Sequence, residues 1–288
     1  MVAWTLTVKH LPHSSLQVVA QMRVSLIKTR VSIYSFTCFL CVLSSDVIAD
    51  GLADFRSALT QLKSRDPIAV DAQFKLFGRS GERDELIERE GVIEMRLEDG
   101  VNGLHAVYSP ALTAQLHAEE LAKIEDENVK NSALNAVGQF QYWEWRELLY
   151  PAAQMELMLE RNHFVSEKQV EFNGRLTRLL TFSMPMGKID KGFRKYVKKY
   201  NNRFQVWIDD KGVPLASQLT EKGSGRVFIV IGFKFKNEIH TEYRQLGGRL
   251  IAVKREVRDE SSGATMESQR HFIATANPID LPVAGTSN

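Results

Sequence analysis

Residues 164–184 read FVSEKQVEFNGRLTRLLTFSM, and this stretch predicts a β-hairpin. The dipeptide Asn173-Gly174 stands between two segments that are rich in β-branched and aromatic side chains. Asn-Gly favours a type I′ turn, because both residues tolerate the positive φ angles that this turn requires. We therefore expect antiparallel strands over residues 164–172 and 176–184.

The alternation of strands and turns continues toward the C-terminus. Strands are predicted over residues 203–208, 213–220, 226–244, 250–257 and 266–274, with turns at 209–212, 223–225, 247–248 and 261–263. The long run 226–244 would approach about 60 Å at roughly 3.3 Å per residue, so we expect it to bend or break. Its first part, 227–231, is apolar on both faces and is predicted to lie deeper. Strands joined in this way form an antiparallel meander.

Helices are predicted in two places before this meander. A short amphipathic helix over residues 54–64 gathers Phe55, Ala58, Leu59 and Leu62 on one face. Strands are then expected over 68–77, 91–97 and 103–108, with a charged loop over 79–91. A helical block follows over residues 109–161, with Ser109-Pro110 at the start of its first helix, a second segment over 131–149, and Pro151 at the start of a third.

Together these elements predict an α+β fold with one domain over residues 50–277. The expected architecture is a strongly curved, half-barrel-like antiparallel meander that packs against the helical block. The tail over residues 278–288 is expected to be unstructured.

Residues 22–49 have the pattern of a secretory signal peptide. It begins with a basic region, continues with the mostly apolar run 31–43, and ends with small residues at a cleavage site after Ala49. The apolar run is shorter than the roughly 20 residues that span a bilayer. We therefore predict cleavage before Asp50 and a periplasmic or secreted, soluble product.

The predicted cleavage changes the rest of the chain's chemistry. Residues 1–21 would be an upstream extension, with translation beginning at Met22; an extended or uncut leader that begins at Met1 is the alternative. Cys38 and Cys41 would leave with the leader. The whole chain has 37 basic and 35 acidic residues, and residues 50–288 keep 33 and 34, a net charge of about −1. Such a balance gives no global attraction to nucleic acid, so no nucleic-acid partner is predicted.

The residues after the leader contain no recognisable catalytic motif. They have no cysteine, no G-x-S-x-G elbow, no Walker loop and no dinucleotide-binding fingerprint. Their histidines do not stand in metal-ligand spacing, so no metal and no cofactor are predicted. His240 and Glu242 share a strand face that His271 approaches, and we interpret them as a solvated charge ladder. The chain is predicted to be a non-enzyme, with a hydrolase as the third hypothesis.

A basic segment over residues 188–200, KIDKGFRKYVKKY, interrupts the strands. With Asp190 as its N-cap, a helix there would separate aromatic from basic side chains, as in segments that bind anionic membranes or acidic partners. A solvated face on a helix that closes the sheet is the alternative. The predicted membrane or partner surface comprises Lys191, Arg194, Lys195, Lys198 and Lys199.

The order of these elements, with the strand-turn-strand VWIDDKGVP at residues 206–214, resembles the periplasmic lipoprotein-localisation carriers. The resemblance implies an incomplete barrel curled around helices, with an apolar cavity for acyl chains and no catalysis. No site residue is taken from it.

The first functional hypothesis is therefore an exported protein that binds an apolar or acyl ligand, such as a lipid or lipoprotein. The second is an envelope interaction module in which the basic segment docks on a protein or an anionic membrane surface. The aromatic residues near position 145 either line a pocket or pack between helices and sheet. The predicted cavity residues are Phe204, Val206, Ile208, Val227, Ile229, Ile231, Phe233, Trp143 and Trp145.

Overall fold

The computed structural model describes residues 50–227 and 231–279. The predicted upstream extension and leader, with Cys38 and Cys41, lie outside them. So do Ile229 and residues 280–288.

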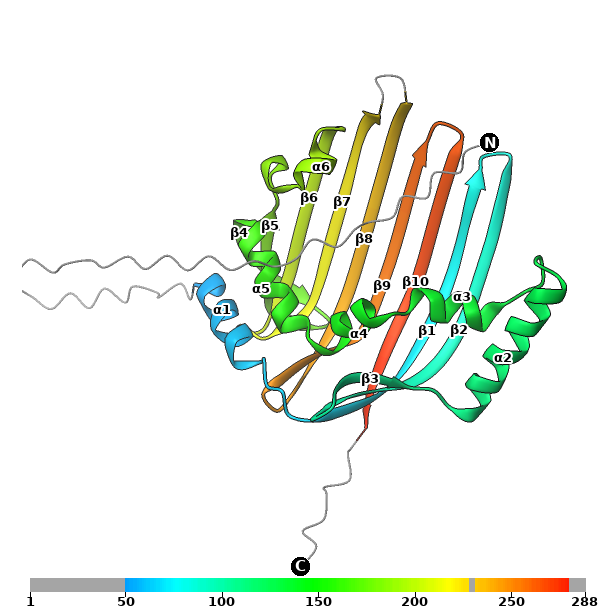
Figure 1. Cartoon of the computed structure of the whole chain (residues 1–288). Helices are drawn as coiled ribbons and strands as arrows, with labels where there is room; N and C mark the ends of the chain where they lie inside the picture. Colours follow the sequence, from blue (N-terminus) through cyan, green and yellow to red (C-terminus); the bar gives the residue numbers. More distant parts are fainter. Residues whose placement is uncertain (1–49, 228–230, 280–288) are drawn as a thin grey trace, which may run out of the picture. The chain divides into compact units, whose positions relative to one another are not determined.

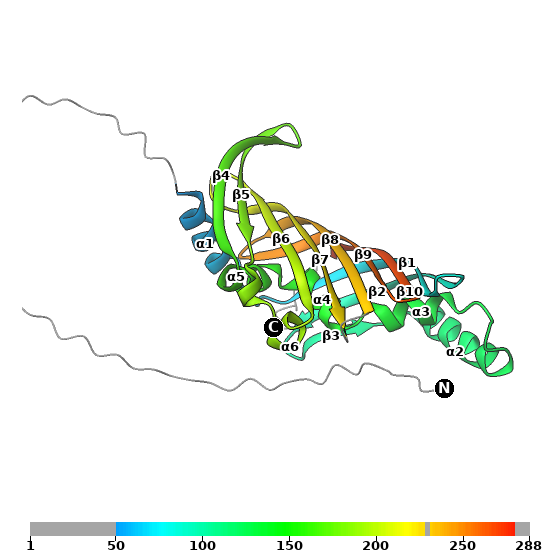
Figure 2. The same ribbon diagram turned by 90° about the horizontal axis from the view of Figure 1, so that it is seen from above.

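Ten strands form one antiparallel sheet (Figure 1). They are β1 (Ile68–Glu82), β2 (Glu85–Gly100), β3 (Gly103–Val107), β4 (His163–Phe172), β5 (Arg175–Ser183), β6 (Val197–Ile208), β7 (Pro214–Val227), β8 (Ile231–Leu246), β9 (Arg249–Gly263) and β10 (Met266–Ile279). Their order is β3-β2-β1-β10-β9-β8-β7-β6-β5-β4, so that β10 returns to pair with β1. β3 and β4 are the edges, and the sheet is not closed. Figure 2 shows the twist of the strands and the curved tip of the β4–β5 hairpin.

Helices cover one face of this sheet. They are α1 (Gly51–Gln61), α2 (Pro110–Glu125), α3 (Ser132–Gln139), α4 (Tyr142–Leu149) and α5 (Pro151–Arg161), with a one-turn α6 (Lys191–Arg194) beside β6. Figure 1 shows α5, α4 and α3 in a row across the strands. We call the helix-covered face the inner face and the opposite one the outer face. The predicted α+β class and antiparallel meander are confirmed.

The inner face is apolar because strand side chains alternate between the two faces and the helices exclude water from one of them. One core lies between β1, β2, β9, β10 and helices α2–α4, where the rings of Phe74 and Phe140 stack with centroids 4.7 Å apart. A second core lies where Phe55 and Leu59 of α1 meet Phe182 of β5. Burying these side chains is the main favourable contribution to folding.

Several local predictions are confirmed. Asn173 and Gly174 have φ angles of 52° and 74°, as the I′ turn between β4 and β5 requires. The Ser109 hydroxyl accepts a hydrogen bond from the Leu112 amide at the start of α2. The predicted apolar face of α1 is buried, although the helix begins three residues earlier, because Asp50 caps it.

The predicted charged loop over residues 79–91 is wrong, because β1 and β2 continue through it and turn at residues 83–84. At this end of the sheet both faces of the hairpin are largely exposed, so charged side chains replace the alternation that marks a half-buried strand. The second helical segment is also divided, into α3 and α4, at Phe140-Gln141. β10 reaches Ile279, two residues into the predicted tail.

The turn predicted at residues 223–225 is wrong as well. Gly223 and Gly225 lie inside β7, opposite Phe235 and Phe233 of β8. A Cβ on Gly223 would lie 2.5 Å from the ring of Phe235, so glycine is needed here to make room for the cross-strand ring.

The long strand predicted over residues 226–244 is therefore two strands, since Val227 of β7 pairs with Ile231 of β8. Of the apolar segment 227–231, only Val227 and Ile231 are among the described residues. They lie at this hairpin end, and Ile231 is 40% exposed instead of buried under the helices. The turn predicted at 261–263 is likewise inside β9, and the chain reverses at residues 264–265.

Candidate functional site

A cleft of about 290 Å³ opens on the inner face between α5 and strands β6–β9. Its walls are mostly apolar. They include Met155, Leu157 and Met158 from α5, and Phe204, Leu219 and Ile239 from β6, β7 and β8.

The cleft follows from the sequence of α5 and from the register of the sheet. Pro151 starts the helix, and positions 155 and 158 then lie one turn apart on the side that faces the strands. On the sheet, Phe204 pairs with Leu219 and Leu219 with Ile239, so three apolar side chains form a row across neighbouring strands.

A polar row lies beside this apolar row. Ser217 of β7 pairs with Thr241 of β8, and Thr241 pairs with Arg255 of β9. The Ser217 and Tyr243 hydroxyls are 2.6 Å apart, and burial raises the pKa of Tyr243 to about 12. All four side chains line the cleft, which therefore has an apolar side and a hydrogen-bonding side.

Arg255 is the most buried charged side chain of this cleft, at 8% exposure. Its Nη1 lies 3.5 Å from Oε2 of Glu144, and its Nε lies 4.0 Å from Oε2 of Glu147. Neither Arg255 Nη1 nor Glu144 Oε2 has a hydrogen-bond partner among the described residues. Burial raises the pKa of Glu144, while the charge of Arg255 opposes that shift.

Farther along the inner face, beyond the helices, is a second polar group. The Tyr200 hydroxyl and the Asn202 amide both donate to Oε1 of Glu221, at 2.6 and 2.9 Å. Burial and this hydrogen bond raise the pKa of Tyr200. The rings of Phe193, Phe233 and Phe235 pack together at the same end, with centroids 5.7 to 6.4 Å apart.

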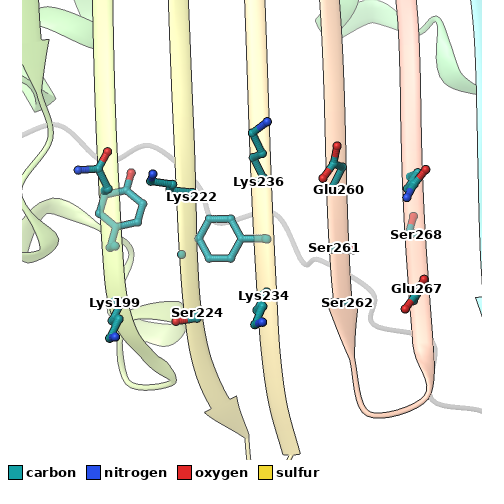
Figure 3. Close-up of a pocket in the computed structure, with 15 residues that line it drawn as sticks. Lys199, Lys222, Ser224, Lys234, Lys236, Glu260, Ser261, Ser262, Glu267 and Ser268 are labelled. Carbon is teal, nitrogen blue, oxygen red and sulfur yellow. The ribbon is translucent and has the colours of Figure 1, made fainter. Parts of the chain in front are cut away.

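The outer face carries a different feature, a groove of about 710 Å³ across the ends of β6–β10 (Figure 3). Lys222 pairs with Lys236, and Ser224 with Lys234, on adjacent strands. Lys199 of β6 joins them opposite Ser224. Glu260 and Glu267 occupy the β9–β10 side, so the groove is basic at one end and acidic at the other.

The structure places the predicted cavity residues in several environments. Phe204 lines the inner cleft, whereas Val206 and Ile208 are fully buried in the second core. Phe233 packs with Phe193, while Val227 and Ile231 stand at a hairpin end.

The two tryptophans in this set also differ. Trp143 is 58% exposed, and Trp145 packs against the first core and donates its indole N–H to the Phe140 carbonyl. Ligand binding by the predicted set stays a prediction.

The predicted basic helix is largely wrong. The Asp190 carboxylate accepts from the Gly192 and Phe193 amides as an N-cap, but α6 ends at Arg194. The chain enters β6 at Val197, which is buried opposite Gly225. Strand pairing thus replaces the helix, and it carries Lys199 into the outer groove.

Sequence reasoning missed most of the cleft residues and three of the four groove lysines. The alternation of apolar and polar residues did place Ile239 on the buried side of its strand. It did not indicate that α5 covers this residue. His240, Glu242 and His271 do form part of a surface charge ladder, with His271 Nε2 2.9 Å from Glu256 and His240 Nε2 3.8 Å from Glu242.

Residues 50–227 and 231–279 contain no group of three or more side chains suited to hold a metal ion. Over the same ranges, the helices are too short or too polar to cross a bilayer.

No protein-family model matches this chain, and no curated protein matches its sequence. Among solved structures, the chain is similar to the LolA superfamily protein NE2245 from Nitrosomonas europaea, at 11% identity and a TM-score of 0.25, over 81% of this chain and 94% of that one. It is also similar to MucB in its complex with MucA(peri), at 12% identity and a TM-score of 0.20, over 79% and 93%. The weak architectural resemblance predicted from the sequence is confirmed, and neither match transfers a residue role.

Proposed function

We propose that this chain is an exported, non-catalytic protein that binds an apolar or acyl ligand in the inner cleft. The observation that carries the proposal is the cleft itself, with an apolar row on the sheet facing the methionines of α5. Periplasmic or secreted localisation rests on the signal-peptide pattern of residues 22–49.

The size and lining of the cleft support this proposal. Ligand pockets are typically about 300–1,000 Å³, mostly apolar, and contain a few polar groups that orient the ligand. The inner cleft, at about 290 Å³, is close to the lower limit of this range. Met155 and Met158 have unbranched, flexible side chains that adapt to the shape of a chain-like ligand.

The test is to fill the cleft and to measure binding of a fluorescent fatty acid. Leu219→Trp places a large ring inside the cleft, and we expect about tenfold weaker binding, because the ring occupies the volume that the chain needs. Thr220→Trp is the matched control, since it adds a ring to the outer face of the same strand.

Equal binding by both variants and the native protein would contradict an acyl site in this cleft. Native mass spectrometry of the protein exported from its own host adds an independent readout. We expect a mass that begins at Asp50 and carries a lipid-sized adduct.

The outer groove favours a second candidate function, docking on an anionic membrane surface or an acidic envelope protein. Lys199, Lys222, Lys234 and Lys236 stand on three adjacent strands, and Lys236 is partly neutralised by Glu238 at 2.9 Å. Each basic residue near an anionic leaflet contributes about 1 kcal/mol. The groove thus extends the predicted basic surface beyond the segment that begins at Lys191.

Charge reversal tests this second candidate. We expect Lys199→Glu, Lys222→Glu and Lys234→Glu together to abolish sedimentation with vesicles that contain phosphatidylserine. The control triple Lys75→Glu, Lys168→Glu and Lys211→Glu makes the same change in net charge at exposed sites elsewhere. Sedimentation of both triples alike would exclude a membrane role for the groove.

A further inference from the structure

We infer that the inner cleft selects amphiphiles with an anionic head group, and that Arg255 holds this head group. The inference rests on the proposed acyl-binding function and names the ligand class for the same cleft. It starts from a buried guanidinium, that of Arg255, whose Nη1 has no hydrogen-bond partner among the described residues.

Arg255 is positioned to bind the head group of a ligand in the cleft. It is 8% exposed, it lines the cleft, and its Nη1 has no hydrogen-bond partner among the described residues. A buried donor without a partner costs free energy, and a guanidinium pairs best with two oxygens of one carboxylate or phosphate. A ligand head group supplies those oxygens.

The neighbouring carboxylates do not fill this role in the structure. Glu144 Oε2 is 3.5 Å from Nη1 and forms no hydrogen bond with it, and Glu147 is 4.0 Å from Nε. The charged side chains that line the cleft are Arg161, Arg255 and Glu147, a net charge of +1. Glu144 lies outside the lining but 3.5 Å from Arg255, and counting it makes the surroundings neutral. The preference for an anionic head group therefore rests on the unpartnered donor Nη1 of Arg255 and not on net charge.

The two rows on the sheet set the orientation of the ligand. Ser217, Thr241 and Arg255 form the polar row, and the adjacent row of Phe204, Leu219 and Ile239 is apolar. A head group at Arg255 thus leaves its chain against the apolar row and the methionines of α5. The cleft is therefore polar on one side and apolar on the other, which matches the polar head and apolar chain of an amphiphile.

The test compares two ligands that differ in the head group alone. Dodecanoate and dodecanol are titrated by displacement of a bound fluorescent fatty acid. We expect the native protein to bind dodecanoate about tenfold more tightly than dodecanol, as one charge-assisted interaction provides. Arg255→Met should remove this difference, lowering the affinity for dodecanoate and leaving that for dodecanol unchanged. Arg258→Met, on the outer face of β9, is the control and should behave as native.

Because Arg255→Met leaves Glu144 buried without its partner, the variant Glu144→Gln/Arg255→Met is measured in parallel, with circular dichroism to verify folding. The role of Arg255 is contradicted if the native protein binds dodecanoate and dodecanol equally, or if the difference in affinity between them persists in the double variant. Either result leaves the proposed acyl-binding function of the cleft unaffected. If neither ligand binds the native protein, the proposed function fails together with the role of Arg255.

Discussion

At the scale of single residues, Arg249 connects four parts of the chain. It is 3% exposed and donates to Oδ2 of Asp99 at 2.5 Å, to the Asp66 carbonyl at 2.9 Å and to the Leu149 carbonyl at 3.2 Å. Its guanidinium lies 4.9 Å from the ring centroid of Tyr150. The start of β9 is thereby fixed to β2, to the linker before β1 and to the end of α4.

Breaking this buried pair should be costly. We expect Asp99→Asn to lower the free energy of unfolding by about 3–5 kcal/mol, because it leaves a buried guanidinium without its counter-charge. Urea denaturation measures the change. Asp71→Asn is the control, since it breaks an exposed pair with Arg96 at 3.4 Å and should cost less than about 1 kcal/mol. Equal effects of the two substitutions would contradict the importance of burial here.

The lowered pKa of Glu256, on the outer face, leads us to expect that the stability of the protein depends on pH. Burial acts to raise its pKa, but hydrogen bonds from His271 and Arg258 outweigh burial, so that the pKa is lowered overall. A lowered pKa means that the ionised form stabilises the fold above the unfolded-state pKa of about 4.3, and that this contribution is lost as pH falls through the folded-state pKa.

We therefore expect Glu256→Gln to be less stable than native at pH 7, by less than about 1 kcal/mol because the partners are partly exposed. The two proteins should become equally stable in strong acid. Urea denaturation from pH 7 downward measures this, and a difference that does not shrink as the pH falls would exclude an electrostatic origin.

At the scale of elements, the sequence predicted best those features that depend on neighbours in the chain. The Asn173-Gly174 turn, the Ser109 cap and the apolar face of α1 were correct, because each depends on interactions within a few residues. The glycines of β7 were misassigned, since their role depends on rings of another strand. The basic segment was predicted as a helix because helical spacing does not reveal that Val197 pairs with Gly225.

The role of Gly223 as space for an aromatic ring can be tested directly. We expect Gly223→Val to destabilise the protein by about 1–3 kcal/mol, because its Cβ would lie 2.5 Å from the ring of Phe235, which must then move. Ser224→Val, on the outer face of the same strand, should change stability by no more than about 0.5 kcal/mol. Thermal unfolding compares the two, and a Gly223 variant as stable as native would show that the Phe235 ring can move aside at no cost, so that glycine is not required there.

At the scale of the whole described chain, the candidate site was the least predictable part. Phe204 was predicted for the cavity and lines the cleft, whereas Arg255 and Met155 were not. The cleft joins α5 to strands that are tens of residues away in the sequence, and its polar row depends on the register of two strand pairs. A single sequence specifies which face of each strand is apolar, but not which helix covers it.

The partial helical cover of the sheet predicts a gradient of stability along its strands. Residues 72–76 of β1 and 93–97 of β2 lie under helices, and their inward side chains are buried. Residues 80–82 and 85–88 continue the same two strands with the same hydrogen-bonded pairing, but they have little buried apolar surface. Local opening is therefore easier at that end.

Hydrogen exchange measures this gradient. The comparison is matched within β1, where residues 72–76 and 80–82 both pair with β2 and β10, whereas residues 96–97 of β2 also pair with β3. We expect the amides of residues 80–82 and 85–88 to exchange at least about tenfold faster than those of 72–76 and 93–97, whose exchange should require near-global unfolding. Added urea should accelerate the protected set more strongly, because its opening exposes more surface. Uniform protection along both strands would instead show that the sheet opens as one unit, independently of the helices that cover it.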